Sequence, residues 1–100
     1  MERTENGRYI VVRGRRWRAM DPELPEPMAA ALRSHLGQAR AAVRAASSDA
    51  GRRAARDRVQ LAKEGLGERS DPWWDMEVEQ RLERAADRLK RLTESASHEF

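Results

Sequence analysis

Three prolines within six positions, at Pro22, Pro25 and Pro27, constrain the fold of this chain more than any other feature. Proline fixes the backbone angle φ and has no amide hydrogen to donate, so it is excluded from the interiors of helices and central strands. Residues 21–27 therefore form neither a regular strand nor a helix interior. Pro25 or Pro27 suits the first turn of a helix, where Glu26 would favour the positive end of the helix dipole.

The part before the prolines has the pattern of a β-hairpin. Residues 8–12 are rich in β-branched and aromatic side chains, and residues 15–19 form a second short strand after a turn that contains Gly14. A lone hairpin is marginally stable in water, so we expect this one, over residues 8–19, to pack on the helices that follow.

Two registers of this hairpin are open. A turn at residues 13–14 pairs Ile10 with Trp17, and a turn at residues 14–15 pairs Val12 with Trp17. Side chains alternate between the faces of a strand, so both registers place the same residues on one face. We expect that face to be buried, and it carries Ile10, Val12, Trp17 and Ala19.

The part after the prolines has apolar side chains at helical spacing. Residues 25–46 and 50–66 each carry one apolar seam with steps of three and four residues. Their linker is short and contains good N-cap candidates, which predicts an antiparallel helical pair. Gly37 is a candidate for a close approach by another element, and Gly67 for the C-cap of the second helix.

A third helix is predicted over residues 73–92, with Asp71 as a candidate cap across Pro72. We expect residues 1–7 and 94–100 to be flexible, because neither terminus shows a periodic pattern. Residues 8–93 then form one small domain of the α+β class. Its predicted architecture is an N-terminal β-hairpin packed on a three-helix unit that contains an antiparallel helical hairpin.

Length and composition exclude several classes of protein. One hundred residues suffice for a single small core. There is no cysteine, which excludes disulfides and thiolate chemistry. The longest apolar run is five residues, 28–32, so we expect neither a membrane span nor a signal peptide.

The charge is distributed unevenly along the chain. The net charge is +3, but residues 1–20 carry six arginines and two glutamates, whereas residues 71–100 carry five basic and eight acidic side chains. Within one fold, these two segments are expected to attract each other. If the acidic helix instead lies on the far side of the molecule, the basic segment stays open to an anionic partner.

Catalytic chemistry is not expected. The two histidines, His35 and His98, form no motif with metal-ligand spacing, and no glycine-rich phosphate loop occurs. Asp71 and Asp75 flank two tryptophans and could hold a cation or a sugar, although a role at the start of a helix explains them better. We therefore predict a protein that is not an enzyme and that has no cofactor and no metal.

Two binding surfaces are candidates. Trp73 and Trp74 point about 100° apart on a helix, so one of them can enter the core while the other lies at a protein interface, or both are tucked beneath the proline-rich segment. The hairpin carries an arginine cluster with interleaved aromatic rings, which is a pattern of nucleic-acid binding. The cluster consists of Arg13, Arg15, Arg16 and Arg18.

The leading hypothesis is a small interaction protein that uses Trp73, Trp74 or an alanine-rich helix face against a protein partner or a second copy of itself. The alternative is a nucleic-acid-associated protein that uses the four hairpin arginines. We expect no membrane partner.

Two stretches also resemble the motifs of a known family. They are residues 9–26, YIVVRGRRWRAMDPELPE, and residues 62–75, AKEGLGERSDPWWD. These stretches resemble a family of short bacterial proteins without an assigned function, some of which carry the label biopolymer transporter Tol. The resemblance implies a bacterial source and a cytoplasmic location, and it implies no catalytic or binding residues. We expect no role as a transporter subunit, since the chain has no apolar stretch long enough for an anchor.

Overall fold

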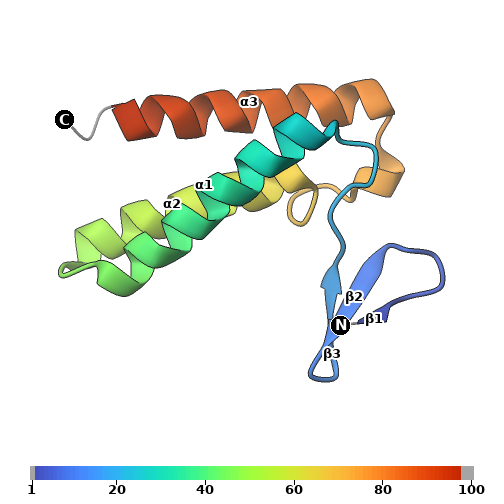
Figure 1. Ribbon diagram of the computed structural model, residues 1–100, viewed down its shortest axis with the longest axis horizontal. Helices are drawn as coiled ribbons and strands as arrows, with labels where there is room; N and C mark the ends of the chain where they lie inside the picture. The colour runs from blue at the N-terminus through green and yellow to red at the C-terminus, as the bar shows by residue number, and fades with distance from the viewer. Residues whose placement is uncertain (1, 98–100) are drawn as a thin grey trace.

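The computed structural model describes the backbone of residues 2–97 and has the α+β architecture predicted from the sequence (Figure 1). A three-stranded antiparallel sheet packs on three helices. The elements follow in the order β1 (Glu2–Arg3), β2 (Tyr9–Val12), β3 (Arg15–Arg18), α1 (Glu26–Ala45), α2 (Asp49–Leu66), the 3₁₀ turn η1 (Trp73–Asp75) and α3 (Val78–Ser97).

The hairpin adopts the first of the two predicted registers, in which Ile10 pairs with Trp17. Both turn residues have a positive φ, +53° at Arg13 and +78° at Gly14. Two consecutive positive φ angles are typical of the two-residue turn whose twist matches a hairpin. Glycine adopts this conformation at little cost, which explains why the turn includes Gly14.

The N-terminal residues form a strand where we expected a flexible segment. β1 pairs with β2, with Glu2 opposite Val11. A tight turn brings it there: the Thr4 amide donates to the Tyr9 carbonyl at 2.9 Å, and Gly7 has a φ of +71°. A two-residue strand is too short to show an alternating pattern, so no sequence pattern indicates it.

The two helices of the antiparallel pair begin and end within one residue of the predicted positions. The Ser48 hydroxyl accepts a hydrogen bond from the Gly51 amide at 3.0 Å and caps α2, and Gly67 ends α2 with a φ of +88°. Both α1 and α2 pack on α3, and the core lies between the three helices (Figure 1). Its buried side chains are Leu24, Ala29, Leu32, Leu36, Ala62, Leu66, Ala85 and Leu92.

The close approach between helices is at Gly65 and not at Gly37. A Cβ atom on Gly65 would lie 2.8 Å from Cδ2 of Leu32, which is fully buried, whereas a Cβ atom on Gly37 would meet nothing within 4 Å. Gly37 is exposed on α1. The absence of a side chain is therefore needed at Gly65, where α1 and α2 meet.

These two glycines give opposite predictions for stability. Gly37→Ala is expected to raise the free energy of unfolding by about 1 kcal/mol, because alanine favours a helix over glycine by that amount. Gly65→Ala is expected to lower the free energy of unfolding by about 1–2 kcal/mol. Overpacking against Leu32 costs about 1–3 kcal/mol, which exceeds the gain in helix propensity. Urea denaturation of both variants measures this. A stabilised Gly65→Ala would contradict the close packing of α2 on Leu32.

The third helix begins five residues later than predicted. Trp73–Asp75 form the separate turn η1, Met76 is extended, and α3 begins at Val78. The Gln80 side chain accepts a hydrogen bond from the Glu77 amide at 3.3 Å, which is half of a capping box and fixes this start.

We predicted that the Asp71 side chain caps a helix, and this prediction is wrong. Its backbone carbonyl instead accepts a hydrogen bond from the Arg84 guanidinium at 2.8 Å. At the other end, α3 continues to Ser97, into the segment that we expected to be flexible. Residues 98–100 of that prediction lie outside the described residues.

A buried junction around Asp21 joins the sheet to the helices. The Asp21 carboxylate is 2% exposed and lies 3.0 Å from the Arg81 guanidinium on α3, and the Asp21 amide donates to the Leu66 carbonyl at 2.9 Å. The Trp73 indole donates to the Ala19 carbonyl at 3.0 Å. Residues from both sides of the proline-rich segment thus meet at one point.

The predicted buried face of the hairpin is largely open. Ala19 is buried, but Ile10 and Val12 are half-buried and Trp17 is 39% exposed. The reason is that the sheet contacts the helical part at one end, through the Ala19 carbonyl and through the contact between Tyr9 and Trp74. The rest of the sheet extends away from the helices (Figure 1). The expected core face instead looks onto a hollow between the sheet and the helices.

Candidate functional site

Two neighbouring hollows lie beside the projecting sheet. The first, between the sheet and the helices, has a volume of about 290 Å³ and is lined by Ile10, Val12, Trp17, Arg40, Lys63 and Glu68. The second, between α1 and α2, has a volume of about 430 Å³ and is lined by Arg40, Val43, Arg44, Arg56, Val59 and Arg69. Because Arg40 borders both, we treat them as one surface and call it the basic groove.

The floor of the basic groove is apolar and its rim is cationic. Arg40 and Arg44 are one helical turn apart on α1, and Arg56 and Lys63 are two turns apart on α2, so each pair extends from one face of its helix. Between the two pairs lie valines that contribute the apolar floor. The groove therefore combines positive charge with a surface suited to flat or apolar groups.

The lining of the basic groove holds five cations and one carboxylate, Glu68. Arg40, Arg44, Arg56 and Arg69 form no ion pair with a carboxylate of residues 2–95. Burial lowers the pKa of Lys63, and the like charges of Arg69 and Arg40 lower it further. Repulsion among the cations is the expected consequence of gathering five of them around one carboxylate.

Glu68 is the acidic member of this lining. Burial raises the pKa of the Glu68 carboxyl, although Lys63, Arg40 and Arg69 oppose that shift.

The four hairpin arginines do not form a single patch. Arg13 is exposed at the turn, and the Arg15 guanidinium lies 4.3 Å from the centre of the Trp17 ring, beside the basic groove. Arg16 covers Tyr9 at 4.4 Å on the other face of the sheet, and Arg18 donates to the Ser70 carbonyl at 2.7 Å. Arg13 and Arg15 are therefore the hairpin arginines that can extend the groove.

The rings of Trp73 and Trp74 make contacts with other residues of this chain. Trp73 is buried, and the half-buried Trp74 ring lies 5.3 Å from Trp73 and 5.4 Å from Tyr9 in edge-on contacts. The guanidinium groups of Arg8 and Arg18 lie 5.1 and 5.7 Å from the Trp74 ring. The pair attaches the sheet to the helices, and both rings make contacts within the chain.

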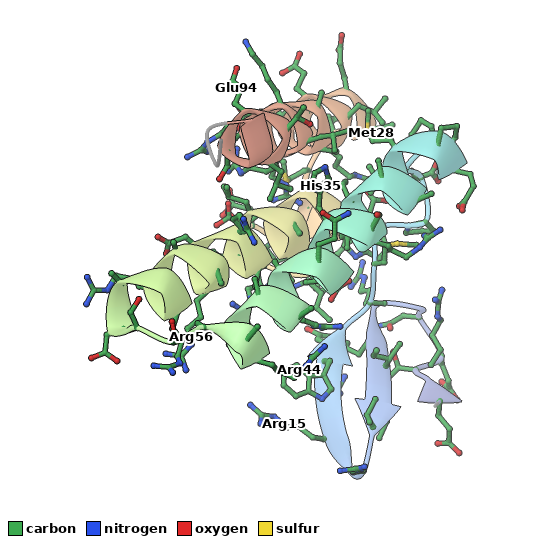
Figure 2. The ribbon with its side chains drawn as sticks, turned by 60° about the vertical axis from the view of Figure 1, so that its left-hand side comes forward. Arg15, Met28, His35, Arg44, Arg56 and Glu94 are labelled. Carbon is green, nitrogen blue, oxygen red and sulfur yellow. The ribbon has the colours of Figure 1, made fainter. Side chains whose placement is uncertain are left out.

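The third helix, α3, carries four acidic and five basic side chains, so the acidic charge of the C-terminal segment lies mainly before it, at Asp71, Asp75 and Glu77. Both views draw α3 above α1 and α2 and the sheet below them, and Figure 2 shows Arg44 and Arg56 on the lower side of α1 and α2, Arg15 on β3 and Glu94 on α3 (Figures 1 and 2). In the described residues, none of the four hairpin arginines forms an ion pair with α3. Asp71 directly follows Ser70, whose carbonyl accepts a hydrogen bond from Arg18, so part of the acidic stretch lies beside the hairpin.

Other chemistry has less support in the described residues. Within residues 2–95, no three histidine, aspartate or glutamate side chains gather as metal ligands do. His35 is half-buried on α1, His98 lies outside the described residues, and Asp71 and Asp75 are both exposed. None of the described helices has the length and apolar character needed to cross a membrane.

No family model, no curated protein and no solved structure matches this chain. The groove residues on the helices were missed by sequence reasoning, although a signal for them exists. Arg40, Arg44, Arg56 and Lys63 have no carboxylate three or four positions away, unlike most charged residues of α3. A cation without such a helical partner is a candidate for a contact outside its own helix.

Proposed function

We propose that this protein is a nucleic-acid-binding protein without catalytic activity, and that the basic groove is its contact surface. The observation that carries the proposal is the set of arginines that form no ion pair among the described residues and that surround an apolar floor. Arginine forms two parallel hydrogen bonds with a phosphate group, so arginines without carboxylate partners are well suited to a phosphate backbone.

A contact surface at Trp73 and Trp74 has weaker support. Both rings make contacts within the chain, and Trp73 is 9% exposed. Self-association through an alanine-rich helix face has no observation in its favour beyond composition. The proposal therefore places the function at the groove, extended by Arg13 and Arg15. A cytoplasmic location, where nucleic acid is accessible, is part of the proposal.

A salt titration tests this proposal. Five cations line the groove, and each phosphate contact on a single strand contributes about −0.7 to the slope of log affinity against log salt. Affinity for a labelled oligonucleotide is therefore expected to fall about 100-fold between about 50 and 200 mM salt. Fluorescence anisotropy measures it. Absence of binding at about 50 mM salt, or an affinity independent of salt, would contradict the proposal.

A further inference from the structure

We infer that the hollow beside Trp17 receives a single unpaired nucleobase, so that the preferred ligand is single-stranded nucleic acid and not a duplex. This inference rests on the proposed function and names the form of nucleic acid that the same groove selects.

The first support is the exposure of Trp17. Its side chain is 39% exposed, and it is one of two large hydrophobic residues in the described chain that remain so open, the other being Val78 on α3. Trp17 lies within β3, paired with Ile10, so the sheet fixes the point from which the ring extends. An aromatic ring at the surface is the platform on which proteins stack unpaired bases.

The second support is the shape and lining of the hollow. Its volume of about 290 Å³ is at the lower end of small-molecule sites, which accommodates one flat ring system. Ile10 and Val12 line it on the sheet side beside Trp17, and Arg40 and Lys63 line it on the side of the helices. A base inside a duplex is stacked on both faces and cannot enter such a hollow, whereas an unpaired base can.

The third support is the position of the cations around the ring. The Lys63 ammonium lies 5.6 Å from the centre of the Trp17 ring, and the exposed Arg15 guanidinium lies 4.3 Å from it. When a base stacks on the ring, Arg15 moves from the ring to the adjoining phosphate. Arg40, which borders both hollows, binds the next phosphate and directs the strand along the second hollow toward Arg56.

The groove also has a suitable length. Arg56 and Lys63 are seven residues apart on α2, which corresponds to about 10 Å along the helix axis. Stacked nucleotides repeat every 3.4 Å or so along a strand, so this distance spans about three nucleotides. An oligonucleotide of about 12 nucleotides is therefore long enough to cover the groove and the hairpin.

The test compares single-stranded and duplex forms of one 12-nucleotide DNA sequence, at about 50 mM salt, by fluorescence anisotropy. The unmodified protein is expected to bind the single strand at least about 10-fold more tightly than the duplex. Trp17→Ala is expected to lower single-strand affinity about 10- to 100-fold, and Trp17→Phe to retain most of it. Val78→Ala, at the other exposed apolar residue, is the matched control and should leave the affinity unchanged.

The outcomes separate the two proposals. If the single strand and the duplex bind equally and both depend steeply on salt, this inference is overturned and the proposed function stands. If neither binds, both are overturned. Trp17→Ala with unaltered single-strand affinity also overturns the inference. If circular dichroism shows that Trp17→Ala does not fold, the inference is tested by the quenching of Trp17 fluorescence when the single strand binds. The contribution of Trp17 is the difference in quenching between the unmodified protein and Trp17→Phe. Equal quenching in those two proteins contradicts stacking.

Discussion

Asp21→Ala is expected to lower the free energy of unfolding by about 3–5 kcal/mol, the largest effect of any single substitution considered for this chain. The carboxylate is 2% exposed and its partner Arg81 is 12% exposed, so the substitution leaves a cation enclosed without its counter-charge. It also removes the acceptor of the Glu23 amide, which Asp21 binds at 2.9 Å. A domain of this size is stable by about 5–15 kcal/mol, so the loss is a large part of the whole.

Thermal unfolding measures this prediction, with an expected fall in Tm of about 15–30 °C. Glu26→Ala is the matched control, because Glu26 also pairs with an arginine, Arg33 at 2.6 Å, but in an exposed position. An exposed pair contributes about 0–1 kcal/mol. Asp21→Asn, which retains an acceptor for the Glu23 amide, is expected to be intermediate. If Asp21→Ala and Glu26→Ala have equal effects, the junction does not join the two parts of the fold.

Reversing two charges in the basic groove is expected to have the largest effect on binding. The double variant Arg40→Glu/Arg56→Glu changes four units of charge at positions that line the second hollow. One unit of charge about 4 Å from a phosphate is worth about 1 kcal/mol in water, so the affinity for a single strand should fall by on the order of 100- to 1,000-fold. Both side chains are exposed on helices, where arginine and glutamate have similar helix propensities, so the fold should be retained.

The control for net charge lies on α3. Lys90→Glu/Arg91→Glu makes the same change of four charge units at two exposed positions of α3. If the groove is the contact surface, this control should alter affinity less than about 3-fold at about 150 mM salt, because screening limits its reach to about 8 Å. Equal losses in the two double variants would mean that overall charge, and not the groove, determines binding.

The elements of the fold could be predicted from local patterns. The register with Ile10 opposite Trp17, the cap at Ser48 and the C-cap at Gly67 each depend on a few neighbouring residues whose conformational preferences are strong. The start of α3 was placed wrongly because Pro72 resembles the first residue of a helix, and the capping role of Gln80 was not considered.

The candidate site could be predicted only in part, because it depends on how the sheet meets the helices. The hairpin pattern identifies Trp17 as apolar, and an apolar face ordinarily becomes core. Its exposure follows from the junction at Asp21 and from the contact between Tyr9 and Trp74, which attach the sheet by its end. These contacts join residues about 60 positions apart in the sequence, and a local sequence pattern does not predict contacts over such a separation.

The central claim, that the basic groove is the contact surface, is tested most directly by nuclear magnetic resonance. Uniformly labelled protein is titrated with a single-stranded oligonucleotide of about 12 nucleotides, and the backbone amide shifts are followed. The largest changes are predicted along the hairpin and along the facing turns of α1 and α2, around Trp17, Arg40, Arg56 and Lys63, with the outer face of α3 unchanged. Changes centred on α3, or spread evenly over all three helices, would contradict the account.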